Sequence, residues 1–160
     1  KSFDLHYIST RKCTQELINQ IDFEKNSRIE FQEKALQLIN SEDGPNQLAN
    51  KIDEKIKQYG SNRVIIDGMR NISTLDNLKK KHSDLIIVYV EMSRDKAFEI
   101  YKRDRSSNIT LNEFRNERNH EIEREVTLFK SRADLYVFNG GKLNQLYNEI
   151  FLWWSKNVSL

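Results

Sequence analysis

Two short, uninterrupted apolar runs restrict the fold of this chain more than any other feature. Residues 64–67 read V-I-I-D, and residues 85–90 read L-I-I-V-Y-V. Continuous runs of β-branched residues predict strands that are buried on both faces. The segment between them carries Leu75 and Leu78 at helical spacing. A helical crossover of this length joins parallel strands, so the pattern predicts a βαβ unit and an α/β fold.

Further strands are predicted at residues 3–8 and 134–138, where aromatic and β-branched residues concentrate. Capping residues mark the expected helix starts, and glycine marks one expected end. The first three helices should run from Arg11 after a Ser9-Thr10 cap, from Asn26–Ser27 to Ile39, and from Pro45 to Gly60. The next two should run from a cap at Asn71 or Ser73 through Leu78, and from Arg94 to about Arg103. One long charged helix should begin at the Thr110–Glu113 capping box, and a last helix should run from Leu143 to about Trp154. We expect one domain over residues 1–160.

Composition narrows the class of protein. At 160 residues with 38% hydrophobic content, the chain can bury one modest core. Its 26 basic and 24 acidic residues give a net charge of +2 without a basic tail, which does not indicate nucleic-acid binding. The one cysteine, Cys13, excludes an internal disulfide and suits a reducing compartment. No apolar run approaches the roughly 18 residues of a membrane span, and no signal peptide opens the chain, so we expect a soluble, cytoplasmic protein.

Asp67 is the strongest candidate for a functional residue. Its strand should end at the rim of a parallel sheet, where open α/β sheets bind ligands. A carboxylate there can hold a water of hydrated Mg²⁺, and Arg70, three residues later, can reach a phosphate. Structural roles are the alternatives: Asp67 can cap the next helix or form an Asx turn, and Arg70 can be an ordinary surface arginine.

A second basic group flanks a polar break between two predicted helices. Lys102, Arg103 and Arg105 precede residues 106–108, S-S-N. A cationic loop can close over phosphates and neutralise the charge that develops during transfer. The alternative is a solvated helix end whose basic residues complement the helix dipole. A zinc site has no support, because the H-E-x-x-H pattern begun at His120 lacks its second histidine.

Several segments resemble, in order, a group of P-loop kinases related to nucleoside monophosphate kinases and dephospho-coenzyme A kinases. The family's V-I-D-G-I-R-N segment is similar to residues 64–71, V-I-I-D-G-M-R-N. Its segment before the lid is similar to residues 97–105, A-F-E-I-Y-K-R-D-R. Its last strand and turn are similar to residues 133–143, A-D-L-Y-V-F-N-G-G-K-L. Three more segments are similar to segments of this family: residues 111–118, L-N-E-F-R-N-E-R; residues 27–32, S-R-I-E-F-Q; and residues 44–49, G-P-N-Q-L-A. The resemblance implies a three-layer α/β/α, P-loop NTPase-like fold with a mostly parallel sheet.

The resemblance also implies roles for particular residues. Asp67 would be the Walker B acid, acting on Mg²⁺ through its waters. The acceptor side would include Arg70, Arg11 and Arg28. Arg103 and Arg105 would be lid arginines near the transferring phosphate, and Asn139 with Gly140 would border the adenine pocket. The implied reaction is Mg²⁺-dependent phosphoryl transfer from ATP to a nucleotide-like acceptor.

The phosphate-binding loop of this family is missing from the chain. No G-x-x-x-x-G-K-[ST] occurs in the 160 residues, and the resemblance places that loop, with the first central strand of the sheet, before Lys1. Phosphoryl transfer depends on such positioning, so we expect the chain by itself to be inactive. We also expect an upstream segment, or a strand from elsewhere, to fill the place between the strands at 63–67 and 85–90, which should therefore not pair directly. The alternative is a non-catalytic nucleotide-binding or regulatory module of a larger protein, for example one fused to a deaminase-like domain or bound to a protein partner.

Overall fold

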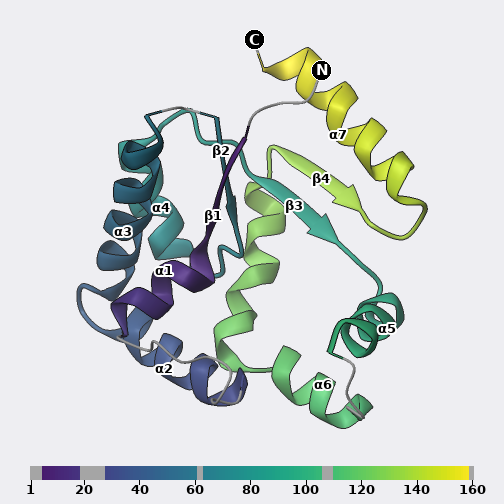
Figure 1. Ribbon diagram of the computed structural model, residues 1–160, viewed down its shortest axis with the longest axis horizontal. Coiled ribbons are helices and arrows are strands. Elements are labelled where there is room, and N and C mark those ends of the chain that lie inside the picture. Colours follow the sequence, from purple (N-terminus) through teal and green to yellow (C-terminus); the bar gives the residue numbers. More distant parts are fainter. Residues whose placement is uncertain (1–4, 19–27, 61–62, 106–109, 159–160) are drawn as a thin grey trace. The chain divides into compact units, whose positions relative to one another are not determined.

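Short parallel strands and a larger number of helices make up the chain. The structure, a computed structural model, describes residues 5–18, 28–60, 63–105 and 110–158. Strand β1 (His6–Ser9) pairs in parallel with β2 (Val64–Asp67), and β3 (Val88–Glu91) pairs in parallel with β4 (Leu135–Phe138). The helices are α1 (Thr10–Leu17), α2 (Arg28–Asn40), α3 (Gly44–Tyr59), α4 (Ile72–Lys81), α5 (Arg94–Arg105), α6 (Leu111–Arg118), the 3₁₀ helix η1 (Glu121–Arg132) and α7 (Leu143–Asn157). The protein is therefore α/β, with its strands in two-stranded sheets (Figure 1).

The chain divides into two compact units. Unit 1 combines Lys1–Leu85 with Asn119–Val126, and unit 2 combines Ile86–Arg118 with Thr127–Leu160. Unit 1 contains β1 and β2, and unit 2 contains β3 and β4. Because β2 and β3 belong to different units, the expectation that they do not pair directly stays a prediction. The further strand expected between them, and the single domain, stay predictions.

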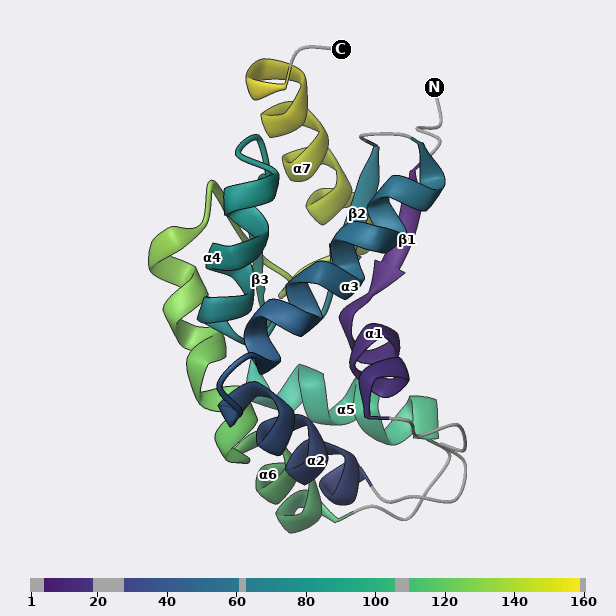
Figure 2. The ribbon, with the colours of Figure 1, turned by 90° about the vertical axis from the view of Figure 1, so that its left-hand side faces the viewer.

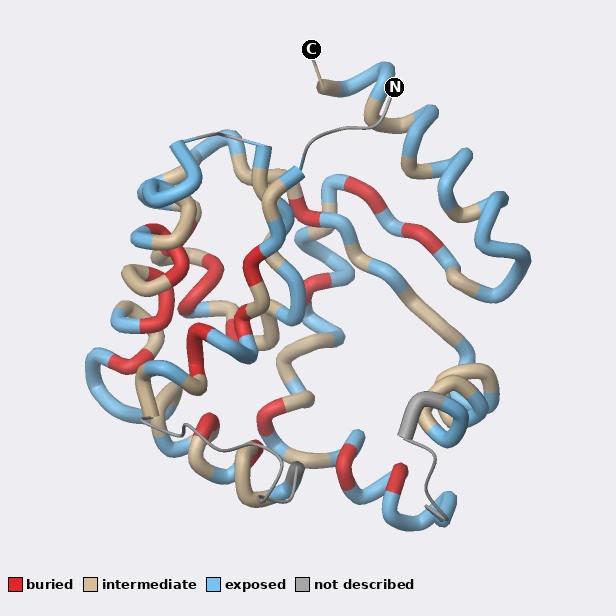
Figure 3. Tube along the Cα trace, in the orientation of Figure 1, coloured by how far each residue is buried: buried red, intermediate tan, exposed pale blue. Residues whose placement is uncertain are grey.

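The core of unit 1 lies between α3, α4 and one face of the β1–β2 pair. Its buried members are Ile8, Cys13, Leu48, Ala49, Ile52 and Leu78. They come from one strand and three helices, and Ile52 and Leu78 are fully buried. Figure 2 shows α3 and α4 side by side, and Figure 3 shows buried residues gathered along them. Burial raises the pKa of the Cys13 thiol, which suits a packing residue.

The prediction that the apolar strands are buried on both faces is wrong for β2 and for β3, in which Val88 and Val90 are exposed. Neighbouring side chains of a strand point to opposite faces, and the helices of unit 1 pack against the face that carries Ile8 and Ile66. On the other face Tyr7 is 56% exposed and Ile65 is 46% exposed. Burial on both faces needs a covering layer on each side of the sheet, and the described part of unit 1 covers one side.

The caps predicted at Ser9 and Thr110 are confirmed, whereas the helix start expected at Asn26–Ser27 lies outside the described residues. The Ser9 hydroxyl accepts a hydrogen bond from the Lys12 amide at 3.4 Å, and Thr110 and Glu113 form the expected reciprocal capping box. At the other end of a helix, Gly60 ends α3 with a φ of 61°. That left-handed conformation favours glycine, because it has no Cβ.

Three predicted boundaries need correction. Among the described residues the first strand starts at His6, because Leu5 does not belong to it, and residues 3–4 of the predicted strand lie outside the described ranges. Strand β3 starts at Val88 rather than Leu85, because Leu85 packs against the core of unit 1. The long charged helix divides after Arg118, where His120 makes a turn by accepting from the Ile122 and Glu123 amides.

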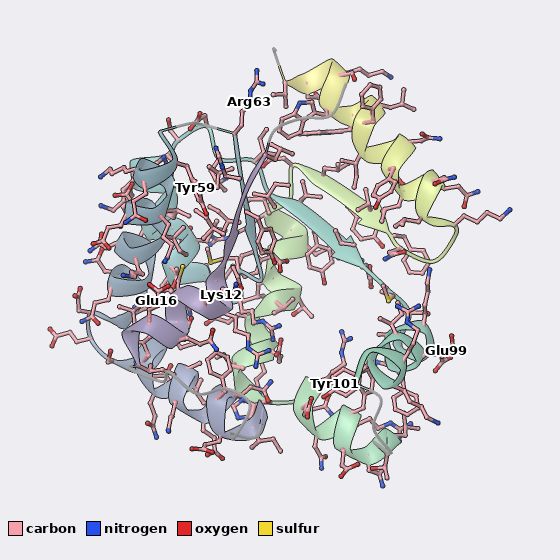
Figure 4. All side chains as sticks on the ribbon, in the orientation of Figure 1. Lys12, Glu16, Tyr59, Arg63, Glu99 and Tyr101 are labelled. Atoms are coloured by element: carbon pink, nitrogen blue, oxygen red, sulfur yellow. The ribbon has the colours of Figure 1, made fainter. Side chains whose placement is uncertain are left out.

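Unit 2 is held by aromatic packing and by the contact of α7 with β4. Phe98 and Tyr101 of α5 lie 5.2 and 5.3 Å from Phe114 of α6, measured between ring centroids. The Tyr101 hydroxyl, labelled in Figure 4, also donates to Glu117. Helix α7 contacts β4, and its adjacent Trp153 and Trp154 are both half-buried. None of the described helices combines the length and apolar character that crossing a membrane requires.

A buried carboxylate links α3 to the end of α4. Asp53, 5% exposed, accepts a hydrogen bond from Lys57 Nζ at 2.8 Å and lies 2.9 Å from His82 Nε2. The Lys57 hydrogen bond lowers the pKa of Asp53, burial opposes it, and the His82 hydrogen bond lowers the pKa further, so the net shift is downward. The ionised form of Asp53 therefore stabilises the folded state.

Replacing Asp53 with asparagine should lower the free energy of unfolding at neutral pH by about 1–3 kcal/mol, because charge-assisted hydrogen bonds are lost. A carboxyl whose pKa is lowered by folding stabilises the protein above its ordinary pKa of 3.8. It loses this effect as the pH falls through the folded value. Denaturant unfolding measures the free energy of unfolding of the wild type and of Asp53→Asn. The two values should differ at pH 7 and approach each other below pH 3.8. Asp84→Asn, at an exposed position, is the control, and a difference that does not change with pH would contradict the prediction.

Candidate functional site

The carboxyl ends of β1 and β2 lie side by side in unit 1. The strands are parallel, and their register sets Ser9 against Asp67. The segments that follow the strands, 9–11 and 67–71, therefore begin at one edge of the sheet. This is the edge at which open α/β sheets bind ligands.

The segment after β1 brings polar groups to the first turn of α1. Ser9 caps the helix, Thr10 is 5% exposed, and Arg11 is exposed. The Thr10 Oγ1 atom is buried and finds no hydrogen-bond partner among the described residues. Glu16 anchors the helix, because its carboxylate pairs with Lys55 Nζ of α3 at 2.7 Å. The hydrogen bond from Lys55 lowers the pKa of Glu16.

The segment after β2 turns sharply and starts α4. Gly68 has a φ of 79°, a left-handed conformation that a side chain would strain. Asn71 caps α4, its Oδ1 accepting from the Thr74 amide at 2.8 Å. This loop keeps Asp67 exposed at the strand end and places Arg70 half-exposed three residues later.

A cavity of about 190 Å³ lies in unit 1, and both segments contribute to it. Its lining residues are Ser9, Thr10, Arg11 and Thr14 from the first segment and α1; Phe31, Gln32, Ala35 and Ile39 from α2; Leu48 from α3; residues 67–71 from the second segment; and Ile122 from η1. The cavity is smaller than the roughly 300–1,000 Å³ of pockets for drug-sized ligands. Its volume suits a small molecule or part of a larger one.

Side-chain contacts orient the charged groups of the cavity. The Arg11 guanidinium carbon lies 5.2 Å from the centre of the Phe31 ring, a cation–π distance. Arg70 forms an ion pair with Glu123. The Tyr7 hydroxyl donates to Asp67 Oδ2 at 2.6 Å, and this hydrogen bond to a carboxylate raises the pKa of Tyr7. The cavity thus combines two guanidinium groups, one carboxylate and an apolar wall.

Unit 1 brings together three of the residues that the sequence singles out, because Asp67, Arg70 and Arg11 all line the cavity. Arg28 is the first residue of α2, and its side chain lies outside the described part of the chain. The remaining predicted residues belong to unit 2: Arg103 and Arg105 on α5, and Asn139 and Gly140 in the turn between β4 and α7.

The predicted residues of unit 2 have separate surroundings. Arg103 is exposed on α5, whereas the side chain of Arg105 is not described. Asn139 is held in its turn by Lys96, whose Nζ donates to Asn139 Oδ1 at 3.3 Å and to the Gly141 carbonyl at 3.0 Å. Gly140 is exposed next to it.

The donors near Asp67 are compatible with Mg²⁺ but not with a metal site built only from protein ligands. Among the described residues no group of three or more His, Cys, Asp or Glu side chains could hold a metal ion. Mg²⁺ usually keeps several waters and uses one or two carboxylates with substrate phosphates. Asp67 is exposed and Tyr7 donates to its Oδ2, so Oδ1 is the carboxylate oxygen that could hold such a water.

Several residues of the cavity were not predicted from the sequence. Thr10 could have been found from the sequence, because it follows a predicted strand and the carboxyl ends of neighbouring parallel strands lie side by side. Phe31 and Gln32 could not have been found in this way, because their helix meets the strand ends only through tertiary packing. No family model, curated protein or solved structure matches the chain.

Proposed function

We propose that unit 1 binds the phosphate of a nucleotide-like molecule and that this molecule is the acceptor in a Mg²⁺-dependent phosphoryl transfer. The observation that carries the proposal is the convergence of Arg11 and Arg70 on one cavity beside Asp67. Guanidinium groups recognise phosphates through paired hydrogen bonds. The buried Thr10 Oγ1 gives a further polar contact, since a ligand oxygen would satisfy it. The Phe31 ring gives the attached organic group an apolar surface.

In this proposal Asp67 holds Mg²⁺ through its water ligands, and the metal neutralises phosphate charge when bound. The ATP phosphates are held by a P-loop outside the 160 residues. The parallel pairs β1–β2 and β3–β4 support the resemblance to P-loop nucleotide kinases, whose strand order has one more strand between the equivalents of β2 and β3. The exposed Ile65 of unit 1 and, separately, the exposed Val88 and Val90 of unit 2 are apolar residues that further elements of such a fold would cover.

A nucleotide-binding module without catalysis is the second candidate. The hydrogen bond between Tyr7 and Asp67 favours it, because one oxygen of the proposed metal-binding carboxylate is already engaged. Such a module, alone or fused to another domain, would bind the nucleotide in the same cavity. Binding without ATP-dependent turnover of the full-length protein would distinguish it from a kinase.

Titration calorimetry with a nucleoside 5′-monophosphate and with the corresponding nucleoside tests the proposal. The monophosphate should bind more tightly, and Arg11→Gln should weaken its binding about 10–100-fold, the effect of losing a hydrogen bond between charged groups. Lys12→Gln removes the same charge from the next residue, which is exposed on α1 and labelled in Figure 4. It should leave binding unchanged. Equal binding of the two ligands to the wild type would refute the proposal.

A further inference from the structure

Glu123 connects two walls of the cavity through a single oxygen atom. Its Oε1 accepts a hydrogen bond from Gln32 Nε2 at 3.0 Å and forms the ion pair with Arg70. Gln32 belongs to α2 and is 3% exposed. Arg70 belongs to the loop between β2 and α4. Both side chains line the cavity, so one carboxylate fixes two residues of the cavity that come from different elements.

Glu123 acts from outside the cavity. Its neighbour Ile122 lines the cavity, whereas Glu123 does not, and the Glu123 side chain is 16% exposed. The carboxylate therefore does not fill the space that a ligand would occupy. An arginine has five N–H donors in a planar fork, so a carboxylate on one side is compatible with a phosphate on another.

A second carboxylate of the same segment holds the neighbouring part of the loop. Glu125 Oε2 accepts from the Ile72 amide at 2.7 Å and from Asn71 Nδ2 at 3.0 Å. The pair Glu123 and Glu125 thus binds three consecutive residues, 70–72, at the start of α4. Exposed Glu121, in the same segment, has no such contact among the described residues.

We propose that Glu123 is a positioning residue for phosphate binding. It holds the guanidinium of Arg70, and the amide of Gln32 beside it, in the orientation that meets the ligand. This inference rests on the proposed function, because it assigns Glu123 to the same cavity. Its effect on affinity comes from ordering a long side chain before the ligand arrives, so less freedom is lost on binding.

The test compares the full chain as wild type, Glu123→Gln and Glu121→Gln. Glu123→Gln should weaken binding of a nucleoside 5′-monophosphate about three- to tenfold, the effect of leaving one long side chain to be ordered on binding. It should not weaken binding of the phosphate-free nucleoside. Glu121→Gln, which removes the same charge from an exposed position, should change neither affinity. If Glu123→Gln lost the same affinity for both ligands, Glu123 would have a structural role only. If Glu123→Gln bound the monophosphate more tightly than the wild type, Glu123 would compete with the ligand for Arg70. Either result would contradict the inference.

A second measurement needs no ligand. In ¹⁵N side-chain spectra of the wild type, the Arg70 guanidinium, assigned with Arg70→Lys, should give resolved signals of a group with hindered rotation. Glu123→Gln should collapse them, and Glu121→Gln should not. If the wild type binds neither ligand, the proposed function fails while these spectra still test whether Glu123 orders Arg70. Identical Arg70 signals in wild type and Glu123→Gln would overturn the inference.

Discussion

Replacing Ile52 with alanine should lower the free energy of unfolding of unit 1 by about 2–5 kcal/mol, the range for truncating a buried isoleucine. Ile52 is 0% exposed and belongs to the core that joins β1, α1, α3 and α4. The surrounding residues come from rigid helices and a strand, so they can refill the space only in part. The loss is a large part of the stability of a small domain.

Ile65→Ala is the matched control for this experiment. It removes the same atoms from β2, but Ile65 is 46% exposed, so the loss should be about 1 kcal/mol or less. Circular dichroism follows the helices of both units, whereas the fluorescence of Trp153 and Trp154 reports on unit 2, which contains both tryptophans of the chain. Equal losses for the two alanine variants would contradict the burial of Ile52.

Replacing Asp67 with asparagine should abolish Mg²⁺-dependent phosphoryl transfer by the full-length protein. The loss should be about a thousandfold or more, because the transferring phosphate depends on positioned metal charge. The substitution is nearly isosteric at an exposed position. Single-turnover assays with radiolabelled ATP and a nucleoside monophosphate would measure it.

The fold and the phosphate binding that we propose for unit 1 should remain in the Asp67→Asn protein. Its circular dichroism spectrum should match the wild type, and its binding of the monophosphate should not weaken, because Arg11 and Arg70 are unchanged. Asp84→Asn, at an exposed position of unit 1, should retain full turnover. Unchanged turnover in the Asp67→Asn protein would remove Asp67 from its proposed role.

Local chemistry explains why much of the secondary structure could be predicted from sequence. The caps at Ser9, Asn71 and Thr110 depend on hydrogen bonds that span three residues, so the sequence contains both partners of each. Gly60 ends a helix through its own backbone freedom. The alternation of apolar runs with helical segments favoured parallel strands, and the described pairs β1–β2 and β3–β4 are parallel. The βαβ unit expected to join β2 and β3 stays a prediction.

The parts that could not be predicted depend on contacts between distant residues. Exposure of Ile65 depends on which helices cover the sheet, and a run of β-branched residues gives no information about that. The candidate site divides in the same way. Asp67 and Arg70 were found because they follow a recognisable strand, whereas Gln32 and Glu123 meet across 91 residues of chain. Neither carries a local motif.

The discontinuity of unit 1 has a consequence for the order in which the protein can form during synthesis. Ile8, Leu48, Ile52 and Leu78 have all been made once the ribosome reaches Leu85, so this core can assemble early. Glu123 and Glu125 follow only after residues 86–118, which belong to unit 2. At about 5–20 residues per second, that interval lasts several seconds. A nascent chain therefore passes through a stage in which every residue of the unit 1 core has been made, while the loop at residues 70–72 still lacks the two carboxylates that hold it.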